Sequence, residues 1–157
     1  MLLYMSNSSP LKPSTPLHSV SVAGVVVRED GKVLAIRRAD NGTWEPPGGV
    51  LERSEAIEDG VRREVYEETG IKVRVERLTG VYKNMTVGVV AMVFRCRPEG
   101  GVEQLSDEST AVSWLTADEA VAAMSEVYAV RITDALRDEA PHIRTHDGRK
   151  LTPVASG

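Results

Sequence analysis

The chain has 157 residues, with 19 Lys and Arg against 23 Asp and Glu, and its formal net charge is -4. This length suits one domain, which can bury roughly two-thirds of its unfolded surface without metal or disulfide cross-links. The charge balance excludes a broad positive field, so long DNA or RNA is not an expected partner.

No segment indicates export or a membrane. The first residues lack a basic lead and a long apolar core, and no stretch approaches the apolar length of a membrane span. The single Cys96 lies in an apolar run and has no second cysteine to pair with, which favours a small buried hydrophobic residue over a catalytic thiol. We therefore expect a cytoplasmic protein without a membrane partner.

The amino-terminal part predicts a tail followed by a hairpin. Residues 1–17 are rich in Ser, Pro and Asn and predict a disordered tail, so the folded domain is expected to span 18–138. Residues 20–27 and 32–38 are rich in β-branched side chains and predict two strands of a hairpin around a turn at 29–31. A loop at 39–47 follows and ends on two prolines, which stiffen the approach to Gly48 and Gly49.

An acidic helix is predicted next. Ser54 as N-cap and Gly70 as C-cap place it at about 55–69. At roughly 100° per residue, the apolar side chains Ile57, Val61 and Val65 form one stripe, which should be buried. Gly60 inside the helix is unfavourable, so room for a ligand or a close-packed neighbour is an expected compensation.

Three carboxylates border this apolar stripe, and other residues occupy the opposite side of the helix, which should face solvent. Glu64, Glu67 and Glu68 stand at i, i+3 and i+4, which brings them together on the helix surface. At the edge of the core such groups are partly desolvated and unfavourable unless they are paired or bind a metal ion.

The second half predicts a sheet and two helices. Strands are expected at 71–77, 85–97 and 111–115, with the long apolar strand 85–97 in the centre and a turn at 98–101. Thr116 and Glu119 form a capping-box pattern that begins a helix, and 124–136 carries a last helical pattern. Residues 139–157 are polar and predict a loose tail with solvated His142 and His146. The element order favours an α/β/α sandwich with a mixed sheet.

The acidic helix lies in a longer pattern of fixed spacing. Gly49 is followed after five residues by Glu55, and after seven more by a run with these fixed positions: Arg63, Glu64, Val65, Glu67, Glu68, Gly70 and Ile71. This pattern resembles the complete signature of the Nudix hydrolases, including the MutT-like members. An accidental match has odds on the order of one in a million. The resemblance covers about 20–136 and implies the same sandwich, with the signature as a loop-helix-loop.

The resemblance also implies the metal site. Carboxylate oxygens without His or Cys suit Mg²⁺, or Mn²⁺, rather than Zn²⁺. Glu67 and Glu68 would be the main ligands, with Glu64 as a ligand or general base and the carbonyl of Gly48 as a further ligand. Arg63 would orient Glu64 or Glu68. Structural roles fall to Gly49, Glu55 and Gly70, with an ion pair from Glu55 to Arg63.

Another acid is expected from a later loop, as a ligand or base. Glu108 is the first choice and Asp107 the second, so the general base stays open among Glu64, Glu108 and Asp107. An ordinary solvated acidic loop explains these residues equally well.

Substrate contacts are expected from the strand and loop before the signature. Of Arg37 and Arg38, only one should face inward, where it could bind phosphate. Trp44 is available to stack on a base and Glu45 to accept a hydrogen bond from it, as the similar segment of MutT-like members suggests. Ordinary packing of Trp44 is an equal alternative.

The resemblance implies a function. It is Mg²⁺-dependent hydrolysis of a pyrophosphate bond in a nucleoside diphosphate linked to another moiety, such as a nucleoside triphosphate, by metal-activated water. One alternative is an ADP-ribose or nucleotide-sugar pyrophosphatase, although Thr86 stands about where the ADP-ribose group carries a proline. Another is a non-catalytic nucleotide-binding module. The expected partners are a small nucleotide or diphosphate substrate and a second copy in a homodimer.

Overall fold

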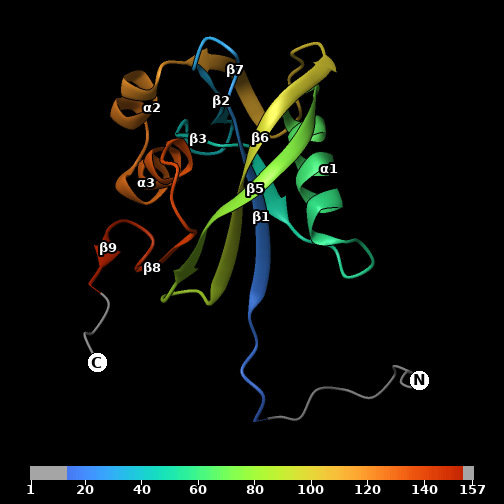
Figure 1. Ribbon diagram of the computed structural model, residues 1–157. Coiled ribbons are helices and arrows are strands. Elements are labelled where there is room, and N and C mark those ends of the chain that lie inside the picture. Colours follow the sequence, from blue (N-terminus) through green and yellow to red (C-terminus); the bar gives the residue numbers. More distant parts are fainter. Residues whose placement is uncertain (1–13, 154–157) are drawn as a thin grey trace.

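Two sheets form the centre of the molecule. The computed structural model describes residues 14–153, so most of the tail predicted at 1–17 lies outside the described residues. The elements are β1 (Ser19–Val26), β2 (Val33–Arg38), β3 (Trp44–Glu45), β4 (Gly48–Val50), α1 (Ile57–Thr69), β5 (Ile71–Asn84), β6 (Val89–Gly101), β7 (Ser109–Leu115), α2 (Ala117–Ala123), α3 (Glu126–Leu136), β8 (His142–His146) and β9 (Leu151–Thr152). A mixed six-stranded sheet has the order β4-β1-β6-β5-β8-β9, and an antiparallel sheet has the order β3-β2-β7 (Figure 1).

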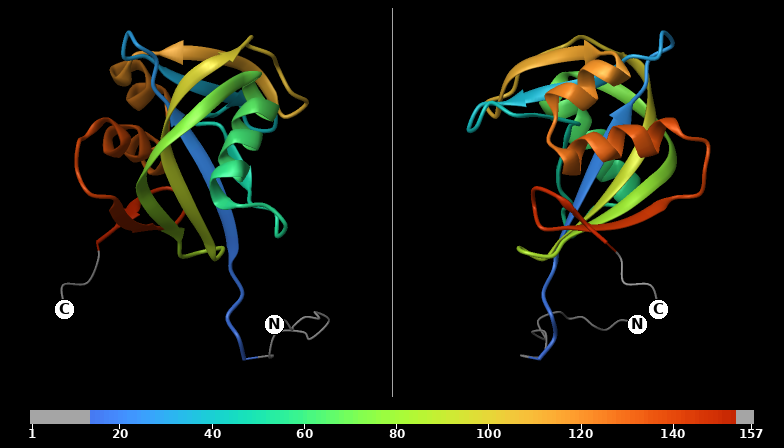
Figure 2. Two further views of the ribbon diagram at one scale, coloured as in Figure 1. Left: turned by 45° about the vertical axis from the view of Figure 1, so that its right-hand side comes forward. Right: turned by 90° about the vertical axis from the view of Figure 1, so that its left-hand side faces the viewer.

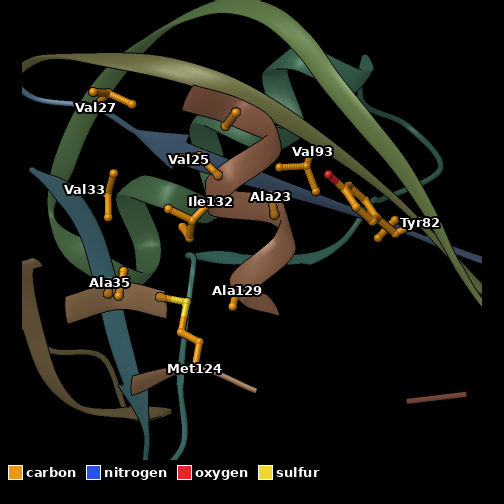
Figure 3. Close-up of a cluster of buried hydrophobic side chains, with 13 residues drawn as sticks. Ala23, Val25, Val27, Val33, Ala35, Tyr82, Val93, Met124, Ala129 and Ile132 are labelled. Carbon is orange, nitrogen blue, oxygen red and sulfur yellow. The ribbon is translucent and has the colours of Figure 1, made fainter. Parts of the chain in front are cut away.

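Helices cover both sides of these strands, which confirms the α/β/α sandwich. Helix α1 lies on one side, and α2 and α3 lie on the other (Figures 1 and 2). The alternation of β1 explains the two cores, because successive side chains point to opposite faces of a strand. Val22 and Val26 pack with α1, whereas Val25 packs with Ile132 of α3 (Figure 3).

The prediction that β1 and β2 pair as a hairpin is wrong, although its turn is present. Strand β1 lies between β4 and β6, whereas β2 lies between β3 and β7 in the other sheet. The two strands share only the isolated bridge from Val27 to Val33. The turn itself is confirmed, because the Arg28 amide donates to the Lys32 carbonyl and Gly31 has a positive φ of 86°. Each strand has neighbours on both edges, and most of its side chains are buried.

The next hairpin is formed by β5 and β6, and its strands end at other residues than predicted. Residues 85–88 form its turn, and the expected turn at 98–101 belongs to β6. The Asn84 side chain accepts from the amides of Thr86 and Val87, and Gly88 adopts a φ of 70°. These local hydrogen bonds end β5 at Asn84 despite the apolar residues that follow. The central position of β6 is confirmed, since it is parallel to β1 and antiparallel to β5.

The loose tail predicted at 139–157 is wrong for residues 142–152, which form two strands, and 154–157 lie outside the described residues. Strand β8 pairs in parallel with β5, and β9 pairs with β8. Arg144 donates two hydrogen bonds of 2.8 and 2.7 Å to buried Asp134, which also accepts one of 2.7 Å from the Tyr82 hydroxyl. His146 is 4% exposed rather than solvated. These polar contacts hold the segment in place, and the apolar periodicity of the sequence gives no sign of them.

The two later helices follow the prediction closely. The Glu119 amide donates to Thr116 Oγ1, and the Thr116 amide donates to Glu119 Oε1, so the capping box at the start of α2 is confirmed. Helix α3 starts at Glu126, two residues later than predicted, after Ser125 as N-cap. Among residues 14–153, no helix has the length and apolar character needed to cross a membrane.

Candidate active site

Helix α1 begins at Ile57, so the prediction of Ser54 as its N-cap is wrong. Ala56 is the N-cap and makes no side-chain cap hydrogen bond. Glu55 turns instead to Arg63, accepting bonds of 2.9 Å from Nε and 2.6 Å from the NH2 nitrogen. The Arg63 guanidinium holds the pKa of Glu55 at about 2. The predicted ion pair is therefore present, and it ties the loop before α1 to the helix.

Two of the three residues predicted to form the buried stripe of α1 are confirmed. Val61 and Val65 are fully buried, but Ile57 is 39% exposed because it stands at the first turn, outside the core cluster. Gly70 ends the helix in the left-handed region, with φ 77°, as predicted. A Cβ at Gly60 would lie 2.6 Å from the Leu51 side chain. A close-packed neighbour therefore occupies the space at Gly60, which leaves no room for a cation there.

The three glutamates of α1 lie in different surroundings. Glu68 is 7% exposed, and its Oε1 accepts a 2.7 Å bond from the Gly48 amide. Glu64 and Glu67 accept bonds of 2.5 and 3.1 Å from the same Arg63 nitrogen. Arg63 thus pairs with both of these carboxylates. Within 14–153, no three His, Cys, Asp or Glu side chains are already arranged to hold a metal ion.

Burial and mutual repulsion disfavour the charged form of two of these glutamates. Burial, with the charges of Glu64, Glu45 and Glu108, raises the pKa of Glu68 to about 7 against the opposing bond from Gly48. Burial also raises the pKa of Glu64, although Arg63 opposes this shift. No ion pair within 14–153 includes Glu68. The carboxylates therefore share a surplus of negative charge.

A cavity of about 760 Å³ collects these groups. The carboxylates that line it are Glu52, Glu64, Glu67, Glu68, Asp107 and Glu108. We call it the acidic cavity. The loop before β7 brings in Glu108, whose amide donates to Ser106 Oγ at 3.2 Å and whose carbonyl accepts from the Ala39 amide at 2.9 Å. Both loop acids considered in the sequence thus line the same cavity as the carboxylates of α1.

The paired glycines permit a close approach of β4 to α1. A Cβ at Gly49 would collide with the Glu64 carboxylate, so only glycine lets this carboxylate lie against the strand. At Gly48, the amide rather than the carbonyl is the group seen in contact with a glutamate. These contacts fix the position of Glu64 and Glu68 relative to the backbone.

The donor set of the acidic cavity fits Mg²⁺ or Mn²⁺. The candidate ligands are hard carboxylate oxygens, and Glu68, unlike Glu64 and Glu67, has no cationic partner within 14–153. Release of Glu67, which is 58% exposed, from Arg63 would free a further ligand. The residues present are therefore chemically suited to a divalent ion.

The four substrate-binding candidates divide into two pairs. Arg38 lines the acidic cavity and a second cavity, held by Asp40 at 2.9 and 2.6 Å and by Glu45 Oε1 at 3.1 Å. Glu45 is buried and lines the second cavity. Arg37 is exposed and donates to the Gly42 carbonyl, and Trp44 packs against the core beside α2 and α3. Neither of these two lines either cavity, which favours ordinary packing for Trp44.

Sequence reasoning missed the second cavity, which has a volume of about 240 Å³. Residues from several elements line it, among them Glu45, Tyr82, Tyr128, Arg131 and His146. We call it the inner cavity. One signal was available, because Arg131 lies four residues after Val127 and four before Ala135, both buried, in one row of α3. A charged residue in a buried row indicates either a partner or a ligand.

Comparisons with known proteins extend these observations. The sequence model of the NUDIX domain family matches residues 17–136. A "MutT-like protein" of Streptomyces ambofaciens is 68% identical over 154 residues, which cover 98% of this chain and 99% of that protein. The "ADP-ribose pyrophosphatase" of Methanocaldococcus jannaschii is 33% identical over 100 residues, and the match covers 59% of each chain.

A solved structure shows the same fold. The crystal structure of a NUDIX hydrolase from Nitrosomonas europaea aligns with a TM-score of 0.73 and 23% identity, covering 84% of this chain and 81% of that one. At this identity the alignment supports the arrangement of helices and strands, not a substrate.

Proposed function

Because the chain belongs to the NUDIX domain family and is a Nudix hydrolase, we propose that it cleaves the pyrophosphate bond of a nucleoside diphosphate linked to another moiety. A nucleoside triphosphate or a related nucleotide is the proposed substrate, and Mg²⁺ the proposed cofactor. The observation that carries this proposal is the acidic cavity. It gathers Glu64, Glu67, Glu68 and Glu108 with a surplus of negative charge beside a cationic Arg38.

Each group has a proposed task. Glu67 and Glu68 would hold the ion, with Glu64 as a further ligand or as the base near the attacking water, and the Gly48 carbonyl as another ligand. When bound, Mg²⁺ or Mn²⁺ would neutralise phosphate charge and lower the pKa of the attacking water. Glu108, with Asp107 as the alternative, is the other candidate for the base, since its charge already acts on Glu64 and Glu68.

We assign different tasks to Arg63 and Arg38. Arg63 is 23% exposed and bonds to Glu55, Glu64 and Glu67, so it would position carboxylates rather than touch substrate. Arg38 is 39% exposed and opens onto the acidic cavity, so it would bind a phosphate oxygen. Trp44 and Arg37 receive no task in this scheme.

A substrate panel tests the proposal. Nucleoside triphosphates, nucleotide sugars and dinucleoside polyphosphates are incubated with the protein and Mg²⁺, and the released products are separated by chromatography. We expect a nucleoside monophosphate as one product, with no turnover after chelation of the metal. The double variant Glu67→Gln/Glu68→Gln should lose at least about 10²-fold in kcat.

A matched variant provides the control. Glu58→Gln removes one carboxylate of the same helix at an exposed first-turn position outside the acidic cavity, and should retain wild-type turnover. Full activity of the double variant on every substrate that the wild type hydrolyses would overturn the proposal. So would unchanged turnover after the metal has been removed.

The second candidate substrate is ADP-ribose or a nucleotide sugar. It is favoured by the relative of that name in Methanocaldococcus jannaschii, although the match covers only 59% of either chain. ADP-ribose in the same panel separates the two candidates. A kcat/KM for ADP-ribose at least tenfold above that for every nucleoside triphosphate would favour this alternative.

Cellular location and assembly are further parts of the proposal. A cytoplasmic location is supported by the buried, unpaired Cys96 thiol, which suits a reducing compartment. Homodimer formation rests on the family resemblance alone. Cell fractionation and sedimentation velocity test the two statements.

A further inference from the structure

Arg38 lies where the two cavities meet, and it has two carboxylate partners. It is the last residue of β2 and lines both the acidic and the inner cavity. Its Nε and Nη2 atoms donate to Asp40 at 2.9 and 2.6 Å, and its Nη1 atom donates to Glu45 Oε1 at 3.1 Å. A guanidinium has five N–H groups. Three of them are therefore used, and one on each terminal nitrogen is left for a ligand.

The pairing of Arg38 with Glu45 follows from the register of β2 and β3. Glu45 stands opposite Ile36, and Arg38 shares the face of Ile36 because side chains alternate along a strand. Arg38 is thus a diagonal cross-strand neighbour of Glu45, which a long side chain can reach. The Arg38 amide also donates to the Thr43 carbonyl at 2.9 Å, so the backbones of the two strands stay together up to Arg38.

The two carboxylate partners differ in burial. The Asp40 side chain is 60% exposed. An ion pair in such surroundings is weak and exchanges its partner readily, because water screens both charges. The Glu45 side chain is 9% exposed, and within 14–153 its one ion pair is with Arg38. Loss of that pair would leave a buried charge without a cation, which is strongly unfavourable. Glu45 is therefore the lasting partner, and Asp40 is the exchangeable one.

The surroundings of Glu45 hold it in place. Strand β3 consists of Trp44 and Glu45 and pairs with β2. Two prolines follow it and restrict the backbone. The carbonyl of the second, Pro47, accepts a 3.0 Å bond from the Gly24 amide of β1. Strands of both sheets thus bind this short segment, and the Glu45 carboxylate is a fixed point that can orient Arg38.

From these contacts we propose that Glu45 is a positioning residue of the active site. It holds the Arg38 guanidinium at the border of the acidic cavity, and Asp40 occupies other donors of Arg38 only until a phosphate of the substrate replaces it. A guanidinium that is already oriented loses less side-chain freedom when it binds an oxyanion, so it binds more tightly. The inference rests on the proposed function in one respect, namely that Arg38 binds a phosphate.

Three other roles of Glu45 predict different results. A hydrogen bond to the base, as expected from the sequence, would affect only ligands that carry a base. Simple repulsion between Glu45 and the phosphates predicts that neutralising Glu45 strengthens phosphate binding. A purely structural role predicts fewer folded molecules, with an unchanged affinity in those that remain.

A ligand without a base isolates the phosphate contact. Methylenediphosphonate resembles the diphosphate part of a nucleotide and has no P–O–P bond to cleave. Titration calorimetry with Mg²⁺ gives its Kd, and the stoichiometry gives the fraction of protein able to bind. Arg38→Lys should raise this Kd at least about tenfold, because lysine keeps the charge but lacks the planar fork of donors.

Variants of the two carboxylates separate position from charge. Glu45→Asp keeps the charge but is one methylene shorter and no longer reaches Arg38, so Kd should rise about five- to tenfold. Glu45→Gln loses the charge but keeps the length and an acceptor, and it should recover most of this loss. Asp40→Asn should instead lower Kd about two- to threefold, because it weakens a competitor of the phosphate.

A matched control and a double variant identify the route of the effect. Glu76 also accepts a 3.1 Å bond from an arginine, Arg97, but lies outside both cavities, so Glu76→Asp should leave Kd unchanged. In the Arg38→Lys background, Glu45→Asp should change Kd by less than about twofold, because no fork is left to orient. A full effect in that background would show that Glu45 acts on the phosphates by another route.

Steady-state kinetics give a second readout. Glu45→Asp should raise the KM of a hydrolysed nucleotide by about the factor found for Kd, with kcat within about threefold of the wild-type value. A fall in stoichiometry or kcat with unchanged Kd and KM would contradict the inference. Binding by Glu45→Gln more than about threefold tighter than that of the wild type would also contradict it, as would no wild-type binding of the diphosphonate up to about 10 mM.

The two proposals can fail separately. The expected order of Kd values without hydrolysis of any nucleotide would sink the proposed function and leave the task of Glu45 assigned. Hydrolysis of a nucleotide, with equal Kd values for the wild type, Glu45→Asp and Glu45→Gln, would do the reverse.

Discussion

The acidic cavity and the inner cavity share the wall made by Gly48 and Gly49, yet they differ in charge and origin. The acidic cavity has carboxylates in excess, and its main groups come from one continuous stretch of chain. The inner cavity holds one unpartnered donor and one unpartnered acceptor, brought together from strands and a helix far apart in sequence. The two cavities can therefore be altered one at a time, and four predictions test that separation.

The largest effect is expected from Glu68→Gln. This change removes a negative charge of the acidic cavity while keeping the size of the side chain, so kcat should fall at least about 10²-fold. An unchanged kcat would show that the charge of Glu68 is not needed for turnover.

Gly49→Ala should reduce activity by about 10- to 100-fold. The added methyl group would collide with the Glu64 carboxylate and displace it from the strand. The effect should appear in kcat, measured at saturating substrate. Gly100→Ala is the control, because a Cβ there meets no atom within 4 Å, and it should leave kcat unchanged.

Tyr82→Phe should lower the free energy of unfolding by about 2 kcal/mol, because buried Asp134 loses one of its hydrogen bonds. Urea denaturation measures this value. The kcat, which depends on the acidic cavity, should remain within about threefold of the wild-type value. Tyr66→Phe, at an exposed position of α1, should change the unfolding free energy by less than about 0.5 kcal/mol. Equal losses in the two variants would argue against the Asp134 contact.

The smallest effect is a pH dependence of stability without metal. The pKa of Glu68 is raised from 4.5 to about 7, so folding favours its protonated form. This contribution is fully present below about pH 4.5 and is lost as the pH rises through about 7. The unfolding free energy should fall over this range in chelator, less steeply in Glu68→Gln.

Addition of Mg²⁺ provides the check on this pH effect. Because the ion binds the deprotonated carboxylates, it should stabilise the protein more at pH 8 than at pH 5. A stabilisation by Mg²⁺ that does not vary with pH would show that Glu68 is not among its ligands. Inner-cavity variants such as Arg131→Met should keep the wild-type pH dependence.

Features coded by neighbouring residues could be predicted from the sequence. The spacing from Gly49 to Ile71 indicates the family, and local patterns place Gly70 at the end of α1 and the capping box at the start of α2. The ion pair of Glu55 and Arg63 was implied by the resemblance that this spacing carries, and it is present. Each depends on contacts within a few helical turns.

Features that depend on distant pairing could not be predicted. The separation of β1 and β2 into different sheets depends on which strands compete for each edge. The position of β8 depends on Arg144 meeting Asp134, and the inner cavity on Glu45 approaching Arg131. Polar partners of this kind leave no hydrophobic period in the sequence. His146 therefore looked like part of a solvated tail, whereas it is buried.

The place of β8 after the residues of the acidic cavity has a consequence for synthesis. Glu108 is the last residue that lines the acidic cavity, and His146 is the last that lines the inner one. At about 5–20 residues per second, the ribosome adds the intervening stretch of about 40 residues in roughly two to eight seconds. During that interval the nascent chain carries every carboxylate of the acidic cavity but lacks the strand that closes the inner one.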